Sequence, residues 1–287
     1  MALVTGASRG IGRATAIALA RGGLDVAITA RTVHEGDGRD ESGNGAPRPI
    51  AGSLETTARE VEAEGGRALA VRADLLDRAS LAAAVDAVLD EWGRIDVLVN
   101  NAVHTGPGSM ERFVDLDLAW VDAKLQANVV SQLVLIKLVL PVMLDRGEGT
   151  IVDVTSAVAT TDPPAPTGRG GWGLGYALTK GAFHRVAGIL AVELGPDGIF
   201  AVNVEPGYVL TERMQAAQEE LGLAGRYPGA PPSVPASVIA WLAGAHHAQL
   251  GSTITEDERT ALNGTTVSAQ RFARRQGLHP DWRRAAP

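Results

Sequence analysis

The chain has 287 residues, of which 45% are hydrophobic and 21% charged, an ordinary composition for a soluble globular protein. Its formal net charge of −7 provides no basic field that would attract nucleic acid. The absence of cysteine excludes disulfides, thiolate catalysis and cysteine-ligated zinc, and it fits a reducing cytoplasm.

Neither a signal peptide nor a membrane span is predicted. The first residues lack a basic region followed by a long apolar one. The most apolar later stretch, residues 133–144, is interrupted by Lys137 and Pro141 and is too short to cross a bilayer. We therefore expect a cytoplasmic protein with no nucleic-acid or membrane partner.

Short apolar runs alternate with helical patterns along the chain. In chain order, the pattern predicts strand 2–7, helix 11–23, strand 24–30, helix 53–66 with Ser53 as N-cap, strand 67–74, helix 78–93, strand 95–102, helix 120–144, strand 150–156, helix 176–195 and strand 199–207. Several strands carry Val, Ile, Leu and Ala without polar alternation, which indicates burial on both faces of a parallel sheet. Repeated strand–helix–strand units predict a doubly wound α/β fold, which we expect to form one domain over residues 1–287.

Two stretches interrupt this rhythm. Residues 32–52 are rich in glycine, proline and charge, and residues 157–175 are rich in proline and glycine. Loops of this length are often functional in compact domains. They follow the second and fifth predicted strands, at the carboxyl edge where open α/β sheets bind ligands.

A glycine-rich turn joins the first strand to the first helix. The stretch "VTGASRGIGRA" places Gly6, Gly10 and Gly12 there, spaced Gly-x-x-x-Gly-x-Gly. Glycine lets backbone amides approach a pyrophosphate, which then sits on the helix N-terminus. The pattern predicts a dinucleotide site; the alternative is a glycine-rich turn without a ligand.

The end of the second strand bears on the choice of dinucleotide. The stretch "ITARTV" offers Arg31 and no Asp or Glu for a ribose 2′-hydroxyl. Arg31 and Arg9 could pair with a 2′-phosphate, which favours NADP(H) over NAD(H), although both could instead be solvated. An NAD-linked enzyme remains open if residues 32–52 reshape the ribose pocket. Asp74 is placed to bind the adenine amino group or to cap the next helix.

With these residues in view, the chain resembles the classical short-chain dehydrogenase/reductases. The motifs that carry the resemblance follow the family's order over residues 1 to about 215: "TGASRGIG" at 5–12, "NNA" at 100–102, "TS" at 155–156, "YALTK" at 176–180 and "PGYVLT" at 206–211. The resemblance implies a Rossmann-type sheet of seven parallel strands with helices on both faces. It also implies a homo-oligomer, either a dimer or a tetramer.

The resemblance implies a catalytic tetrad of Asn128, Ser156, Tyr176 and Lys180. Hydride transfer to a carbonyl leaves an alkoxide that needs a proton, and a tyrosine hydroxyl, which ionises near pH ~10, is a poor base for the reverse reaction. An ammonium one helical turn away favours the phenolate. By the resemblance, Ser156 would hold the substrate oxygen, with Thr155 as the neighbouring alternative, and Asn128 would hold a water that links Lys180 to solvent.

The glycine motif and the resemblance together assign the cofactor-binding residues. Lys180 would bind the nicotinamide ribose, and Thr211 with the backbone of Val209 would hold the carboxamide. The predicted set is Gly6, Ser8, Arg9, Gly10, Ile11, Gly12, Arg31, Asp74, Leu75, Asn101, Ala102, Tyr176, Lys180, Pro206, Gly207, Val209 and Thr211. No metal site is predicted.

The chain departs from the family pattern near the substrate. Val103 stands where the family usually has glycine, and His104 either touches substrate or is a polar loop residue. Trp172, in the long segment between Ser156 and Tyr176, either walls the substrate pocket or anchors its loop. Residues 208–235 are predicted to form a substrate-binding loop.

The C-terminal segment, residues 236–287, diverges from the family and offers only a candidate last strand at 264–269, which leaves the oligomer interface open. Residues 32–52 weakly resemble an insertion in hydroxysteroid-dehydrogenase-like and citronellol/citronellal dehydrogenase groups, which hints at an apolar carbonyl or alcohol substrate. The predicted activity is reversible hydride transfer between NADP(H) and that substrate. The contrasting hypothesis is a catalytically inactive dinucleotide-binding sensor or scaffold, against which the intact tetrad argues.

Overall fold

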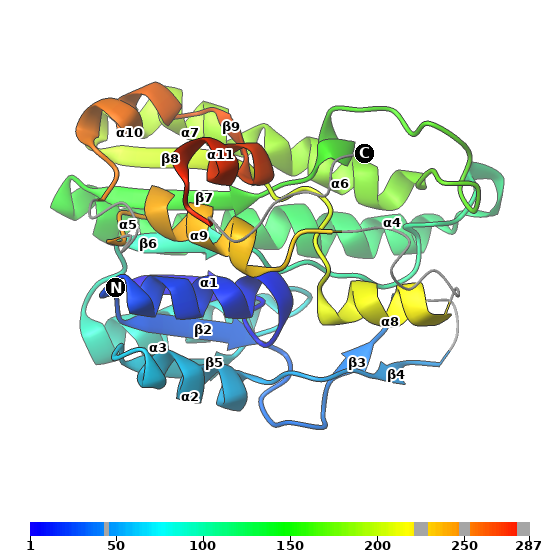
Figure 1. Ribbon diagram of the computed structural model, residues 1–287, viewed down its shortest axis with the longest axis horizontal. Helices are drawn as coiled ribbons and strands as arrows, with labels where there is room; N and C mark the ends of the chain where they lie inside the picture. Colours follow the sequence, from blue (N-terminus) through cyan, green and yellow to red (C-terminus); the bar gives the residue numbers. More distant parts are fainter. Residues whose placement is uncertain (43–45, 221–228, 247–252, 280–287) are drawn as a thin grey trace.

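A seven-stranded sheet of parallel strands forms the centre of the protein (Figure 1). The computed structural model describes residues 1–42, 46–220, 229–246 and 253–279. The strand order is β5-β2-β1-β6-β7-β8-β9. The strands are β1 (Ala2–Thr5), β2 (Val26–Ala30), β5 (Ala68–Arg72), β6 (Val97–Asn100), β7 (Gly149–Val154), β8 (Ile199–Glu205) and β9 (Thr266–Ser268). This confirms the predicted doubly wound parallel sheet.

Two separate hydrophobic cores lie on the two faces of the sheet. Successive strand residues point to opposite faces, so Val4 joins one core and Leu3 the other. The first core is covered by α1 (Gly10–Arg21), α2 (Leu54–Ala63), α9 (Ser233–Leu242) and α11 (Ala269–Gln276). The second is covered by α3 (Arg78–Trp92), α5 (Ser131–Arg146), α6 (Leu174–His184) and α7 (Val186–Leu194).

The strand order reverses between β1 and β6. From β1 the chain runs outward through β2 to β5, then returns to β6 on the other side of β1. The connecting helices therefore leave toward opposite faces, and the carboxyl ends of β1 and β6 are left uncovered. Ligands of open α/β sheets bind at such a point.

Two predicted helices consist of more than one helical segment in the structure. The helix predicted at 120–144 is a continuous helical run of α4 (Leu118–Leu125), the π-helical segment η2 (Gln126–Val130) and α5. The helix predicted at 176–195 is divided at Arg185 into α6 and α7. The predicted N-cap of α2 is confirmed, because the Ser53 hydroxyl accepts a hydrogen bond from the Thr56 amide at 3.0 Å.

The apolar helical run is longer than expected from the sequence. The prediction that this stretch is too short to span a bilayer is wrong, because Leu118–Arg146 forms 29 helical residues with a mean hydropathy of 1.9. Of its most apolar window, 44% is buried inside the protein, where Leu135, Ile136 and Val139 pack on the sheet. Core helices of soluble proteins have the same length and composition, so this feature is weak support for a membrane span. The absence of a membrane partner stays a prediction.

The irregular stretches have some structure of their own. Within residues 32–52, β3 (Arg39–Asp40) and β4 (Arg48–Pro49) form an antiparallel hairpin separate from the main sheet. Residues 157–175 begin with a 3₁₀ turn, η3 (Ala157–Ala159). The predicted loop 208–235 contains α8 (Glu212–Glu220), and its residues 221–228 lie outside the described part of the chain.

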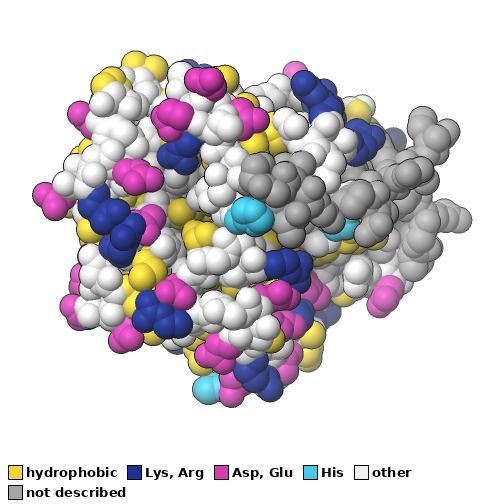
Figure 2. Space-filling model, turned by 60° about the vertical axis from the view of Figure 1, so that its left-hand side comes forward, with side chains coloured by type: hydrophobic (Ala, Val, Ile, Leu, Met, Phe, Trp, Pro, Cys, Tyr) yellow, Lys and Arg dark blue, Asp and Glu magenta, His cyan; other side chains and the backbone are white. Residues whose placement is uncertain are grey.

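The described part of the C-terminal segment contains most of α9, the helices α10 (Glu256–Leu262) and α11, and the last strand. The candidate strand at 264–269 is confirmed as β9, which pairs with β8. It is preceded by α10 and followed by α11. On the described part of the face shown in Figure 2, acidic and basic side chains are interspersed.

Gly198 and Gly65 provide a matched test of close packing at the sheet edge. Both have left-handed φ angles, +85° and +91°, but a Cβ on Gly198 would lie 1.8 Å from the Gly147 carbonyl oxygen, whereas one on Gly65 would meet nothing within 4 Å. Gly65→Ala should cost only the left-handed strain of about 1–2 kcal/mol. Gly198→Ala should cost clearly more in urea unfolding, and equal losses would contradict the predicted collision.

Candidate functional site

Hydrogen bonds between Thr5 and Asn101 join the carboxyl ends of β1 and β6. The Thr5 hydroxyl accepts from the backbone amides of Asn101 and Ala102, each at 3.0 Å. The Asn101 side-chain amide donates to the carbonyls of Thr5 (2.8 Å) and Gly6 (3.2 Å). These bonds hold the start of the glycine loop in contact with the end of β6.

The glycine loop leaves no room for side chains where it meets β6 and α1. A Cβ on Gly6 would lie 2.8 Å from the Ala102 Cα, and one on Gly12 would lie 2.4 Å from the Gly6 carbonyl oxygen. Gly6 and Gly10 also have left-handed φ angles of +66° and +59°. The loop therefore brings the N-terminus of α1, whose N-cap residue Arg9 makes no side-chain capping bond, to the cleft, an arrangement that fits the pyrophosphate of a dinucleotide.

Most of the predicted site residues line one cleft at this edge of the sheet. The predicted residues found there are Gly6, Ser8, Arg9, Gly10, Ile11, Arg31, Asp74, Leu75, Asn101, Ala102, His104, Tyr176, Lys180, Pro206 and Thr211. Gly12, Asn128, Ser156, Trp172, Gly207 and Val209 are not part of this lining.

The cleft also contains residues that sequence reasoning did not assign. They are Ala30, Thr32, Arg39, Asp40, Ile50, Ala73, Val103, Thr105, Val154, Glu212 and Arg213; Thr155, the alternative to Ser156, lines the cleft as well. Four of them belong to residues 32–52. The composition of this stretch is unusual, but it does not indicate which of its side chains line the cleft.

Tyr176 and Lys180 lie one turn apart on α6. The Lys180 Nζ is 5.9 Å from the centroid of the Tyr176 ring and donates a 2.6 Å hydrogen bond to the Val154 carbonyl. The lysine is buried, whereas the tyrosine is half-buried at the cleft. The end of β7 therefore holds the ammonium in place beside the phenol.

Asn128 lies in the π-helical segment and binds the loop that follows β6. Its Oδ1 accepts from the His104 amide at 2.7 Å. Its Nδ2 donates to the His104 carbonyl at 3.3 Å and to the Thr179 hydroxyl at 3.5 Å. Asn128 thus ties the His104 loop to the helix that carries Lys180.

Ser156 and Thr155 follow β7 directly. Thr155 lines the cleft, but its hydroxyl oxygen lies 3.1 Å from the His184 Nδ1 and is therefore engaged. Ser156 is half-buried with an extended backbone. The assignment of the substrate-binding hydroxyl to Ser156 stays a prediction.

Trp172 lies in a different cavity from Tyr176 and Lys180. That second cavity is formed by residues 111–114 and by residues of the 157–175 segment, including Leu174. Next to it, the Gly173 amide donates to the Ser109 carbonyl at 2.8 Å. Trp172 therefore does not wall the cleft of Tyr176, and its position favours the alternative that it anchors the loop.

Asp74 does not cap α3. The N-cap is Asp77, whose carboxylate accepts from the Ala79 and Ser80 amides. Asp74 instead lines the cleft, and its Oδ1 accepts from the Leu76 amide at 3.0 Å. The capping alternative is wrong, and the adenine contact stays a prediction.

The loop after β8 is held by the C-terminal helix. The Gln270 side chain donates to the carbonyls of Pro206 (3.1 Å) and Tyr208 (3.0 Å), on either side of Gly207. Val209 is buried and pairs with Ala230. Gln270 lies in the divergent segment, where no family motif pointed to it.

Comparison with known proteins agrees with this geometry. The sequence profile of the short chain dehydrogenases matches residues 1–42 and 49–222. The chain belongs to the short-chain dehydrogenase family. It is therefore an NAD(P)-dependent oxidoreductase of CH–OH and C=O groups. The gap in the match falls inside the insertion at 32–52.

Individual relatives are distant. The dehydrogenase is 33% identical over 229 residues to a short chain dehydrogenase of Pseudocercospora fijiensis, covering 79% of this chain and 65% of that protein. It is 34% identical over 227 residues to the cyclohexanol dehydrogenase of Rhodococcus sp. (strain TK6), covering 77% and 78%. Its fold matches the L-sorbose reductase of Gluconobacter frateurii complexed with NADPH and L-sorbose, with a TM-score of 0.74, 25% identity and coverage of 93% and 94%.

Burial shifts two ionisable groups beside the dehydrogenase's cleft. It lowers the pKa of Lys124 to about 8; this lysine is fully buried and donates to the Gly106 carbonyl at 2.6 Å. Burial, assisted by the Lys124 charge, also lowers the pKa of His104. The His104 ring is therefore neutral in neutral solution and can act as a hydrogen-bonding group toward a substrate.

A buried carboxyl lies beneath the catalytic pair. Asp153 in β7 is in register with Asn100 and Asn203 on the neighbouring strands. Its Oδ1 accepts from the Asn100 side chain at 2.9 Å, and its Oδ2 has no partner within the described ranges of the chain. Burial raises the pKa of Asp153 to about 7, against the opposing effects of Asn100 and Lys180.

Asp153→Asn should stabilise the dehydrogenase in alkaline solution. The folded protein holds the Asp153 proton more tightly than the unfolded chain, so wild-type stability falls as pH rises from about 4 to about 7 and then stays lower. Asparagine has the same shape and no charge, so the gain should be on the order of a few kcal/mol at about pH 8 and small at about pH 4. Thermal unfolding at both pH values measures it, with exposed Asp162→Asn as control; equal gains would contradict the buried ionisation.

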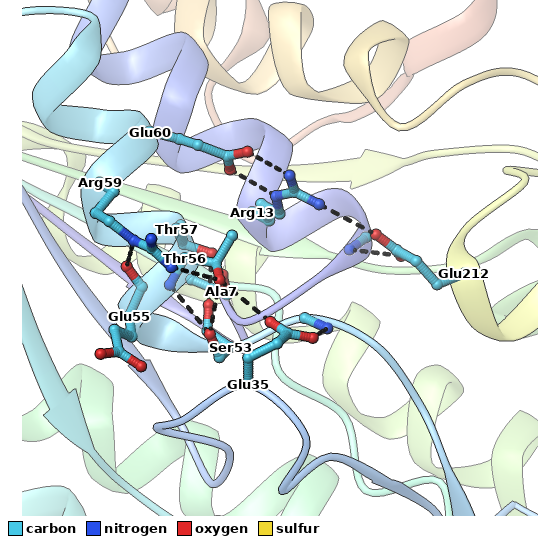
Figure 3. A network of polar contacts seen from close by, with 12 residues as sticks. Ala7, Arg13, Glu35, Ser53, Glu55, Thr56, Thr57, Arg59, Glu60 and Glu212 are labelled. Atoms are coloured by element: carbon cyan, nitrogen blue, oxygen red, sulfur yellow. Dashed lines mark hydrogen bonds and ion pairs between the residues drawn. The ribbon is translucent and has the colours of Figure 1, made fainter.

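A carboxylate from α8 lies at the N-terminus of α1 (Figure 3). The Glu212 Oε2 accepts from the Gly10 amide at 2.9 Å, and its Oε1 is 3.7 Å from the Arg13 guanidinium. Arg13 in turn pairs with Glu60 of α2. Glu212 thus accepts a hydrogen bond from a backbone amide that would otherwise be available to a pyrophosphate.

Glu212→Gln should tighten dinucleotide binding, because it removes a negative charge from the pyrophosphate position. We expect Kd to fall by about threefold to tenfold, measured by calorimetric titration. Glu219→Gln, on an exposed position of the same helix, is the matched control. Unchanged or weaker binding in Glu212→Gln would show that the carboxylate does not compete with the cofactor.

Proposed function

We propose that this dehydrogenase catalyses reversible hydride transfer between NAD(P)(H) and an apolar carbonyl or alcohol, with Tyr176 as the acid–base. The observation that carries the proposal is the position of Tyr176 and Lys180 in the same cleft as the glycine loop. The bound nicotinamide supplies or accepts the hydride. Tyr176 gives a proton to the developing alkoxide, or takes one from the alcohol in the reverse direction.

Lys180 acts through its fixed position. Its hydrogen bond to the Val154 carbonyl holds the ammonium 5.9 Å from the centroid of the Tyr176 ring, where its charge would oppose the negative charge that develops on the tyrosine oxygen during proton transfer. Ser156, next to the end of β7, would hold the substrate oxygen. Asn128 positions the His104 loop along the opposite side of the cleft.

An apolar substrate is supported by the relatives and by the cleft itself. One relative is a cyclohexanol dehydrogenase. Beyond the glycine loop, the cleft is lined by Val103, Val154 and the half-buried, neutral His104. Comparing cyclic ketones with sugars of similar size would test this part of the proposal.

The remaining sequence predictions become part of this proposal. We propose a homo-oligomer, since large apolar side chains are exposed at Phe113, Val114, Leu118 and Val192, and apolar patches commonly mark protein interfaces. We also propose a cytoplasmic enzyme that forms a single domain. An inactive sensor or scaffold would bind the dinucleotide without turning over any substrate, so one assay distinguishes the two.

Tyr176→Phe should reduce kcat by more than about a thousandfold, because general acid–base catalysis contributes on the order of 10²–10⁴ and no other phenol is placed by the described structure in this cleft. The change removes one hydroxyl, so the Kd for NAD(P)(H) should stay within about twofold. The measurements are turnover by NAD(P)H absorbance and cofactor binding by calorimetry. Residual activity within about tenfold of wild type would exclude Tyr176 as the acid–base.

A further inference from the structure

Both arginines that could hold a 2′-phosphate are engaged by residues of the 32–52 insertion. The Arg31 Nη2 lies 2.9 Å from a carboxylate oxygen of Glu41, which directly follows β3. The premise that no carboxylate faces the ribose end of the cleft is therefore wrong. The insertion brings to Arg31 the negative charge that the end of β2 lacks.

Arg9 is held by the other end of the same insertion. Its Nε donates to the Ala51 carbonyl at 2.9 Å, and its Nη2 donates to the Gly52 carbonyl at 2.8 Å and to the Thr32 hydroxyl at 3.2 Å. These three bonds fix the orientation of the guanidinium and occupy its Nε and Nη2 atoms.

The backbone that holds Arg9 is itself fixed. A Cβ on Gly52 would lie 2.5 Å from the Ser8 carbonyl oxygen, so this segment packs directly on the glycine loop. The Gly52 amide donates to Glu35 at 2.8 Å, and Glu35 also accepts from the Thr56 hydroxyl (Figure 3). Arg9 is thus a structural link between the glycine loop and the insertion.

The hairpin places a second carboxylate at the same end of the cleft. Asp40 lines the cleft beside Arg31, with its side chain 7% exposed. The Asp40 Oδ1 accepts from the Ser42 amide at 3.1 Å, and Arg48 lies 3.7 Å from Oδ2. The nearby Arg39 also lines the cleft, but its guanidinium donates to the Gly36 and Gly38 carbonyls, both at 2.8 Å.

We propose that the β3–β4 hairpin makes the enzyme select NAD(H) over NADP(H), with Glu41 as the specificity-determining residue. Glu41 forms an ion pair with the Arg31 guanidinium. Together with Asp40, it would repel the negative charge of a 2′-phosphate. A ribose 2′-hydroxyl carries no charge and can donate a hydrogen bond to a carboxylate. The inference rests on the dinucleotide binding of the proposed function, and it favours the NAD-linked alternative over the NADP(H) preference expected from the sequence.

The test is calorimetric binding of NAD⁺ and NADP⁺, and of 5′-AMP and adenosine 2′,5′-bisphosphate as probes of the adenosine end alone. Wild type should bind NAD⁺ about tenfold or more tighter than NADP⁺. Glu41→Gln, with Glu41→Ala as a second variant, should tighten NADP⁺ and the bisphosphate by about fivefold while leaving NAD⁺ and 5′-AMP within about twofold. Glu55→Gln, an exposed change on α2, should leave all four affinities unchanged.

Two results would overturn the inference. One is tighter binding of NADP⁺ than of NAD⁺ by wild type; the other is a ratio of NAD⁺ to NADP⁺ affinity that stays within about twofold of the wild-type ratio in both Glu41 variants. Failure of the proposed function looks different. Selective NAD⁺ binding with no turnover of any carbonyl or alcohol would refute the activity and leave the selectivity standing. Turnover with a preference for NADPH would support the activity and refute the selectivity.

Discussion

Thr5 and Asn101 exchange hydrogen bonds across the carboxyl ends of β1 and β6, where the strand order of the sheet reverses. Because these bonds pull the first residues of the glycine loop onto the end of β6, Gly6 and Gly12 have no space for a side chain. The same closeness directs the N-terminus of α1 at the cleft. The cradle proposed for the cofactor and the packing at the centre of the sheet therefore depend on one set of contacts.

A second group of polar contacts supports the catalytic pair from within the core. Asn100, Asp153 and Asn203 form a buried row across three neighbouring strands, directly below the carbonyl that holds Lys180. Buried polar groups are costly unless they are satisfied, and this row retains oxygen atoms that have no hydrogen-bond partner among the residues the structure describes. The same strand therefore carries the carboxyl of Asp153 and the carbonyl that holds Lys180, and the Lys180 charge lowers the pKa of Asp153 while burial raises it.

Local patterns predicted the architecture well because parallel strands and their helices have distinctive apolar periods. The glycine loop and the Tyr176–Lys180 pair were found for a related reason: each is a contiguous segment whose spacing already carries its chemistry. Long-range contacts were harder to predict. Nothing in the 32–52 stretch indicated that its ends would hold Arg9 or that Glu41 in its middle would pair with Arg31. The spacing around Trp172 likewise did not reveal that it packs on residues 111–114 and away from Tyr176.

The sequence by itself determined the parallel doubly wound sheet, the backbone cradle for a pyrophosphate and the pairing of a phenol with an ammonium on one helix face, since each follows from residue type and spacing over a few turns. Only the tertiary structure decided which charged groups meet at the adenosine end, which carboxylate reaches the N-terminus of α1 and which residues hold the loop after β8. Those contacts join segments 10 to 202 residues apart. Which groups meet is decided by the packing that folding creates, which a local pattern does not contain.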